Sequence, residues 1–355
     1  MQLKTILLSI AALSLGGATG HLLAQFPVPL PYLLGAMLAN AIGVFVLPQK
    51  LIEGFRIPEV LRQPFIACIG LFIGAQVHLE MITDWTSVLA LLAALTLFTP
   101  VVFAANYLLF RRLGRYDPAT AFFAGSPGGL IEAIELGSEA GAQAPTLIMQ
   151  QFLRIIIVVS LVPFAMSLWV GHPVGSAAGM PVSDPQTQSP LWIILAIAAP
   201  GYLLGKAARL PAGQLTGPLI VAALLGTTGL IQLHLPGWLI ILAQIVISAA
   251  LGLRFNGISA GLLRKGAQLG LASVTLMLGI GALLTAALIQ WLPLSGSAAL
   301  LSFAPGGVTE MALVALSIAA DPAIVTLAHV YRIVLTVIIL TLMCRRFNRP
   351  PFPPK

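Results

Sequence analysis

Two stretches of the sequence share one pattern, Ser126-Pro-Gly-Gly-Leu-Ile-Glu132-Ala133 and Ala304-Pro-Gly-Gly-Val-Thr-Glu310-Met311, and they lie 178 residues apart. The same offset aligns Pro58 with Pro236, Gly74 with Gly252, and Arg154 with Arg332. Self-similarity over about 100 residues at one offset indicates an internal repeat. The sequence therefore predicts two copies of one membrane unit, residues 1–170 and 191–349, joined by a linker at 171–190 and followed by a tail at 350–355.

The composition points to the environment of these copies. The 355 residues are 58% apolar and 8% charged, with a mean hydropathy of +0.99, whereas soluble domains are about 45–50% apolar and about 25% charged. The net charge of +7 comes from cations scattered between apolar runs, which is typical of topology determinants and not of a nucleic-acid-binding face. We expect a polytopic protein in a lipid bilayer, with no nucleic-acid partner.

Each copy contains five apolar runs long enough to cross about 30 Å of hydrocarbon. We predict these spans at 5–24, 30–47, 59–77, 85–110 and 143–169, and at 191–208, 215–233, 237–255, 266–291 and 323–344. The first run has the basic start of a signal peptide, but a similar segment recurs near residue 200, which argues against cleavage. A sixth segment in each copy, 118–140 and 296–319, is interrupted by Pro-Gly-Gly, which removes a backbone donor and adds two residues able to take positive φ.

The interrupted segments either cross the membrane as broken helices or enter and return as hairpins. If they return, and the N-terminus is cytoplasmic, the lysines and arginines outside the spans lie on the cytoplasmic side, in accordance with the positive-inside rule. Five crossings per copy then invert the second copy relative to the first. The expected fold is an all-α polytopic membrane protein with two inverted repeats, each of five transmembrane helices plus a re-entrant segment. Such repeats are typical of secondary transporters, and we expect the inner membrane with both termini cytoplasmic.

A duplicated membrane unit with Pro-Gly-Gly-x-x-Glu near the end of each copy, followed about 22 residues later by an intramembrane arginine, resembles the AbrB-type membrane protein family. Labels given to some members name a transition-state regulator or an ammonia monooxygenase. The topology is also similar to that of the 2-hydroxycarboxylate transporters, whose hairpin tips are glycine-rich; this second likeness is one of topology alone.

The candidate binding residues lie at the two Pro-Gly-Gly tips and on the span that follows each tip. They are Ser126, Pro127, Gly128, Gly129, Glu132, Gln151 and Arg154 in the first copy, and Pro305, Gly306, Gly307, Thr309, Glu310, His329 and Arg332 in the second. The glycines serve either close helix packing or a turn at mid-depth that frees backbone amides for an anion. No catalytic residue, metal ligand or cofactor is expected.

The ionisable residues in the membrane suggest a mechanism, because such residues are costly and are usually functional. Glu132 and Glu310 either couple transport, by protonation or by binding a cation, or form structural ion pairs. Arg154 and Arg332 need partners and either pair with these glutamates or bind a substrate anion. The second copy is preferred because His329, three residues before Arg332, adds a titratable donor on that helix face.

These residues favour a secondary transporter of a small, anionic organic solute, coupled to H⁺ or Na⁺. The alternative is a membrane sensor or scaffold that does not transport and influences gene expression indirectly. A monooxygenase would need clustered metal ligands, typically imidazoles, and the five histidines are scattered; a DNA-binding regulator would need a basic element outside the membrane. We therefore expect no enzyme. The sequence leaves the oligomeric state open, a homodimer included.

Overall fold

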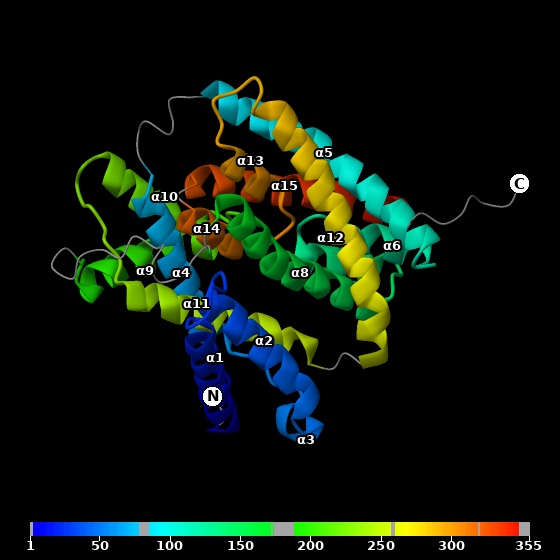
Figure 1. Ribbon diagram of the computed structural model, residues 1–355, viewed down its shortest axis with the longest axis horizontal. Coiled ribbons are helices and arrows are strands. Elements are labelled where there is room, and N and C mark those ends of the chain that lie inside the picture. The colour runs from blue at the N-terminus through cyan, green and yellow to red at the C-terminus, as the bar shows by residue number, and fades with distance from the viewer. Residues whose placement is uncertain are drawn as a thin grey trace, which may run out of the picture. The chain divides into compact units, whose positions relative to one another are not determined.

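The computed structural model describes residues 3–77, 85–171, 173, 188–256, 260–318 and 320–347, and in this part of the chain every regular element is a helix (Figure 1). The all-α fold class is thereby confirmed. Six helical stretches are long and apolar enough to cross a membrane: Leu3–Leu23, Trp85–Arg112, Ala144–Trp169, Gly237–Phe255, Gly261–Leu288 and Pro322–Phe347. Most of the predicted linker and the whole tail at 350–355 lie outside the described residues.

Each predicted span corresponds to one helix, followed in one case by a 3₁₀ turn, and each interrupted segment to two short helices. In the first half the helices are α1 (Leu3–Leu23), α2 (Pro31–Val46), α3 (Gln49–Ile52), α4 (Glu59–Ala75), α5 (Trp85–Arg112), α6 (Pro118–Ala124), α7 (Leu130–Glu139) and α8 (Ala144–Val170). In the second half they are α9 (Leu191–Ala207), α10 (Gly213–Thr227), α11 (Gly237–Gly252), the 3₁₀ turn η2 (Leu253–Phe255), α12 (Ala260–Leu288), α13 (Gly296–Phe303), α14 (Val308–Ser317) and α15 (Pro322–Phe347).

Helix bounds recur at the 178-residue offset. Both ends of α14 follow those of α7 by this distance, and so do the first residues of α13 and α15 relative to α6 and α8. This agreement supports the predicted duplication at the level of local structure. The inversion of the second copy stays a prediction.

Two helices end or begin away from their predicted limits. Helix α10 ends at Thr227, and not near residue 233, because Gly229 has φ of +71° and the amide of Leu230 donates to the carbonyl of Leu225. This is a Schellman ending, in which a left-handed glycine satisfies the last carbonyls. Helix α12 begins at Ala260, so Arg264 and Lys265 lie in its first turns and not in a loop.

The helices form two compact units, and each unit combines parts of both predicted copies. Unit 1 comprises residues 1–85, 160–257 and 309–326, and therefore α1 to α4 and α9 to α11. Unit 2 comprises residues 86–159, 258–308 and 327–355, and therefore α6, α7, α12, α13 and nearly all of α5. Helices α8 and α15 contribute to both units, and α14 belongs to unit 1 from Thr309 onward. Both Pro-Gly-Gly breaks belong to unit 2.

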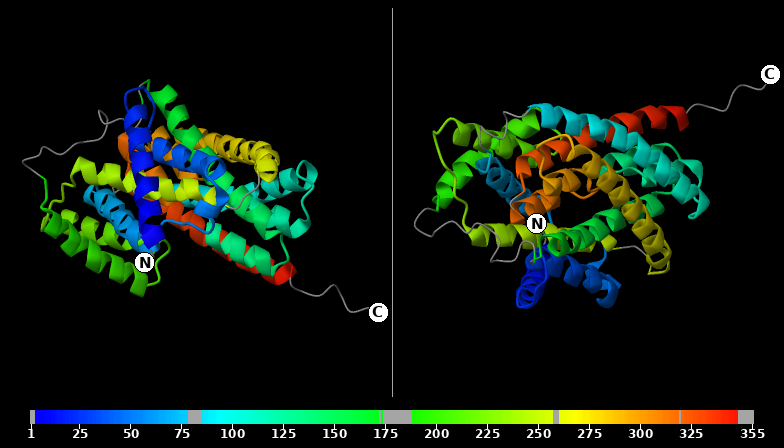
Figure 2. Two further views of the ribbon diagram at one scale, coloured as in Figure 1. Left: turned by 90° about the horizontal axis from the view of Figure 1, so that it is seen from below. Right: turned by 45° about the horizontal axis from the view of Figure 1, so that its top comes forward.

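In unit 1, glycines allow helices to pack at close range. Helices α1 and α2 lie side by side (Figure 2), and a β-carbon on Gly35 would lie only 2.6 Å from the Cα of Gly20. Helices α9 and α10 repeat this contact, since a β-carbon on Gly217 would lie 2.8 Å from the Cα of Gly205. Small residues of this kind are enriched where membrane helices approach closely.

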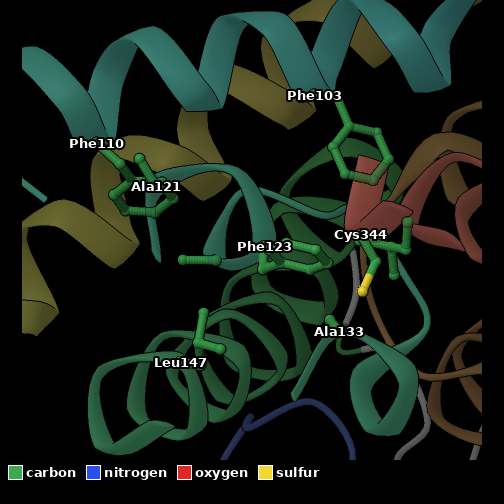
Figure 3. Packing of buried hydrophobic residues seen from close by; sticks show 9 residues of the cluster. Phe103, Phe110, Ala121, Phe123, Ala133, Leu147 and Cys344 are labelled. Atoms are coloured by element: carbon green, nitrogen blue, oxygen red, sulfur yellow. The ribbon is translucent and has the colours of Figure 1, made fainter. Parts of the chain in front are cut away.

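In unit 2, an aromatic cluster packs α5, α6, α7, α8 and α15 around the first break. Phe123 is fully buried at its centre, with Phe103, Cys344, Ala133 and Leu147 around it (Figure 3). Protein interiors pack at the density of organic crystals, so a residue in such a cluster cannot move without displacing its neighbours. The cluster therefore fixes α6, the helix that leads into the first break.

Candidate functional site

The first break separates α6 from α7 between Ala124 and Leu130. Residues Pro127, Gly128 and Gly129 are all buried there, and Gly129 has φ of +57°, in the left-handed region that favours glycine. Ending a helix leaves carbonyl oxygens without intrahelical donors. In a membrane these oxygens must find partners within the protein.

Three side chains satisfy the carbonyls of the first break. The Nε2 of Gln151 donates to the carbonyl of Phe123 at 2.9 Å and to the Ser126 hydroxyl at 2.8 Å. The Nδ2 of Asn106 donates to the carbonyl of Gly125 at 3.2 Å, and Arg154 donates through Nη1 to the carbonyl of Ser126. Both α5 and α8 therefore hold the end of α6.

The second break separates α13 from α14 between Phe303 and Val308, and among the described residues one side chain donates to its carbonyls. The Nη1 of Arg332 donates to the carbonyl of Ala304 at 2.6 Å and, more weakly, to two carbonyls before it; Nη2 donates to Gly306 at 3.3 Å. In the described part of the chain no left-handed residue is found at this break. Of the Pro-Gly-Gly glycines able to take positive φ, Gly129 therefore does so at the first break, whereas Gly306 and Gly307 do not.

The two arginines do not pair with a carboxylate inside unit 2. In the described residues the ion pair within 4.0 Å joins Arg62 to Glu59 on α4. The expected pair between an arginine and Glu132 is therefore not formed, because carbonyls at the helix ends receive the guanidinium N–H groups. Arg154 and Arg332 are 5% and 1% exposed, and both approach the first break, Arg154 at the carbonyl of Ser126 and Arg332 beside Gly128.

Glu132 and Glu310 occupy equivalent positions in α7 and α14, each the third residue of its helix. A carboxylate in the first turn is stabilised by the positive end of the helix dipole. The Oε2 of Glu132 lies 3.4 Å from where a β-carbon on Gly129 would stand, so this carboxylate folds back toward the break. Thr309 and Glu310 are partly buried and belong to unit 1.

The first break also faces α15. A β-carbon on Gly128 would lie 3.4 Å from the Thr336 hydroxyl and 3.9 Å from the Nε of Arg332. Three nearby donors, Thr336 Oγ1, Arg332 Nε and Arg154 Nε, are buried and have no hydrogen-bond partner among the described residues. Unit 2 therefore places uncompensated buried donors and two positive charges around the breaks.

Comparison with known proteins identifies the family. The profile described as "Transition state regulatory protein AbrB" matches residues 32–348. The chain belongs to the AbrB family. Its similarity to "Putative regulator AbrB" of Escherichia coli (strain K12) is 26% identity over 91% of each chain, and to "Uncharacterized protein YhjN" of Bacillus subtilis (strain 168) 24% identity over 95% of this chain and 92% of the relative.

The structure of this AbrB-family chain gathers most of the predicted site residues and adds others. Gln151 and Arg154 meet the first break, and Arg332 meets both. His329 is fully buried one turn before Arg332. Sequence reasoning missed Asn106, which lies on a different span, and Thr336. Thr336 is four residues after Arg332, and this helical spacing is a signal that could have identified it.

Proposed function

We propose that this AbrB-family protein is a secondary transporter that binds a small organic anion at the two breaks of unit 2. The observation that carries the proposal is the pair of buried guanidinium groups, Arg154 and Arg332, without a carboxylate partner in that unit. Burying a charge without compensation costs several kcal/mol. A protein that places two cations together in this way is suited to an anionic ligand.

The carbonyl contacts neutralise the arginines only in part. The C-terminal end of a helix carries about half an elementary negative charge at most, and α6 and α13 have 7 and 8 residues. Positive charge therefore remains at the breaks, in a low-dielectric environment where it attracts an anion more strongly than in water. The planar guanidinium is also the cation best shaped for a carboxylate.

For coupling, we propose Glu132 and Glu310, with H⁺ or Na⁺ as the coupling ion. An ionised carboxylate beside the breaks offsets part of the positive charge that attracts the substrate. Protonation of the carboxylate, or binding of a cation, removes this negative charge and strengthens anion binding, and by linkage the anion strengthens binding of the proton or cation. In this proposal the glutamates act through their charge near the breaks, and not by pairing with Arg154 or Arg332.

The proposal includes the inner membrane, with both termini cytoplasmic and the 171–190 linker outside. A reporter fused after Arg115 is expected to be cytoplasmic, and one fused after Gly175 external. A cytoplasmic reporter at Gly175 would mean that the two copies run parallel and that the breaks do not enter from opposite faces.

The second candidate function is a membrane sensor that does not transport and changes gene expression indirectly. The names of the family and of the Escherichia coli relative, which both describe a regulator, favour it. Both candidate functions require a ligand, so binding alone does not separate them. Movement of the ligand across a sealed membrane does.

The test is uptake of labelled carboxylates by the purified full-length protein in proteoliposomes, with and without an inward proton or sodium gradient. We expect saturable uptake by the wild type, loss of uptake in Arg332→Gln, and normal uptake in the control Arg345→Gln, which removes an exposed cation from the same helix. Binding of a carboxylate without uptake under either gradient would favour the sensor. Equal uptake in wild type and Arg332→Gln would remove the arginine from the mechanism.

A further inference from the structure

Thr336 differs from two other threonines on its helix, the buried Thr326 and the half-buried Thr341. The hydroxyl of Thr326 donates to the carbonyl of Pro322 at 2.7 Å, and that of Thr341 donates to Val337 at 2.8 Å, four residues back in each case. This is the usual way in which a threonine inside a membrane helix satisfies its hydroxyl. The Thr336 side chain is 0% exposed, and its hydroxyl makes no such bond and has no partner among the described residues.

The unpartnered hydroxyl is directed at one point of the first break. It lies 3.4 Å from where a β-carbon on Gly128 would stand, and the Nε of Arg332 lies 3.9 Å from the same point. Gly128 is not left-handed, so its backbone does not require glycine. Because Gly128 has no side chain, the Thr336 hydroxyl and the Nε of Arg332, on one face of α15, have access to the space beside the break.

We propose that Thr336 is a substrate-binding residue and that, with the Nε of Arg332, it holds one carboxylate group of the transported anion beside Gly128. The proposal rests on the function proposed above and deepens it by naming the group that is recognised and the residues that recognise it. A hydroxyl and a charged N–H side by side match the two oxygens of a carboxylate. Leaving both donors buried and unpaired would otherwise cost the protein stability.

The site is asymmetric between the predicted copies. At the 178-residue offset the counterpart of Thr336 is Val158, which is also fully buried. The hydroxyl is therefore present on one side only, and we infer that the substrate is anchored by one carboxylate in one orientation. The substitution Thr336→Val introduces the residue that the first copy already uses, so it removes the hydroxyl with little change in shape.

The experiment measures the thermal unfolding of the purified full-length protein in detergent with acetate, lactate, succinate, citrate, inorganic phosphate or chloride. Wild type, Thr336→Val, Thr336→Ser and the control Thr341→Val are compared. We expect at least one carboxylate to stabilise the wild type, with an apparent Kd raised about tenfold or more in Thr336→Val. Thr336→Ser, which keeps the hydroxyl, and Thr341→Val are expected to bind as the wild type does.

Gly128→Ala provides a second test that does not depend on the threonine. An alanine methyl group would meet Thr336 at ordinary contact distance and would occupy the space assigned to the carboxylate, so we expect normal folding and loss of binding. If Thr336→Val and Gly128→Ala both bind the carboxylate as the wild type does, the inference is wrong and the proposed function stands. If no carboxylate, phosphate or chloride stabilises the wild type, both the inference about Thr336 and the proposed function are wrong.

Discussion

The two breaks of unit 2 carry the same Pro-Gly-Gly sequence but are held in different ways. The first is held by three side chains from two helices, Asn106, Gln151 and Arg154, and its chain turns through a left-handed Gly129. Among the described residues, the second is held by one guanidinium, that of Arg332, which donates to the carbonyls on both sides of Pro305. The same sequence motif is therefore held by different hydrogen bonds in the two halves of the chain. Loss of one side chain leaves two others bonded to the first break, whereas loss of Arg332 removes the side-chain hydrogen bonds described for the second.

The largest expected effect comes from removing that one residue. Arg332→Gln leaves up to four carbonyls at the second break without their donor, and a buried polar group without a partner costs about 1–3 kcal/mol. We expect loss of anion uptake and a thermal unfolding temperature lowered by several degrees. Arg332→Lys is expected to restore only part of the uptake and part of the stability, because an ammonium group lacks the planar set of N–H donors with which a guanidinium bonds several carbonyls.

Arg154→Gln is the matched control for this comparison. It removes the donor to the Ser126 carbonyl, while Asn106 and Gln151 keep their own bonds to the end of α6. The expected loss of stability is smaller than in Arg332→Gln. Equal losses in the two variants would contradict redundant support at the first break.

The next prediction concerns the backbone conformation of the two breaks. Gly129→Val places a β-branched side chain at φ of +57°, which costs about 1–2 kcal/mol or more, and its β-carbon would stand 3.4 Å from the Glu132 carboxylate. Gly307→Val meets no left-handed backbone. We expect Gly129→Val to lower the unfolding temperature and anion uptake more than Gly307→Val. The reverse order would show that the second tip is the more constrained.

A third prediction concerns the carboxylates and the pH dependence of binding. Glu132 lies beside the Gly128–Gly129 turn, which Arg332 on α15 also approaches, while Arg154 on α8 donates to the carbonyl of Ser126 just before this turn. The coupling proposed above removes the negative charge of Glu132 when a proton or cation binds, so wild-type affinity for the anion is expected to change with pH or with Na⁺ concentration. Glu132→Gln is expected to bind with an affinity that changes less with pH.

Glu310→Gln is the comparison variant for this prediction. The sequence favoured Glu310 as the coupling group, whereas the contacts in unit 2 place Glu132 beside the proposed carboxylate. Titration of anion binding from acid to neutral pH in both variants distinguishes them. If Glu310→Gln alone loses the pH dependence, coupling belongs to the second break.

The sequence predicted the helices of this fold well because hydrophobic length and Pro-Gly-Gly interruptions are local signals. The breaks at Pro127 and Pro305 and ten apolar runs follow from such signals. The grouping of helices from both halves into two units could not be predicted in this way, because it depends on contacts between distant segments. Nor could the last residue of α10, which a left-handed Gly229 decides, or the first residue of α12, which is Ala260.

The hydrogen bonds of the candidate residues could not be predicted from the sequence. The sequence suggested that Arg154 and Arg332 either pair with the glutamates or bind a substrate anion. The structure shows that the arginines donate to carbonyls at the helix ends. A helix that is broken within a membrane leaves backbone carbonyls without donors, and these must find donors within the protein. Thr336 was missed because a threonine in an apolar run usually bonds to its own helix, and only the three-dimensional contacts show that this one does not.

The smallest expected effect tests the outermost support of the first break. The Ser273 hydroxyl on α12 donates to the Oδ1 of Asn106 at 2.9 Å, and Asn106 in turn donates to the carbonyl of Gly125. Ser273→Ala removes one hydrogen bond, worth about 1 kcal/mol, but leaves all three donors of the break in place. We expect a slightly lower unfolding temperature, unchanged anion affinity, and a smaller loss of stability than in Asn106→Ala, which removes the donor itself. A loss of binding in Ser273→Ala would mean that α12 helps to set the shape of the break, and that the first break depends on more than the side chains that contact it.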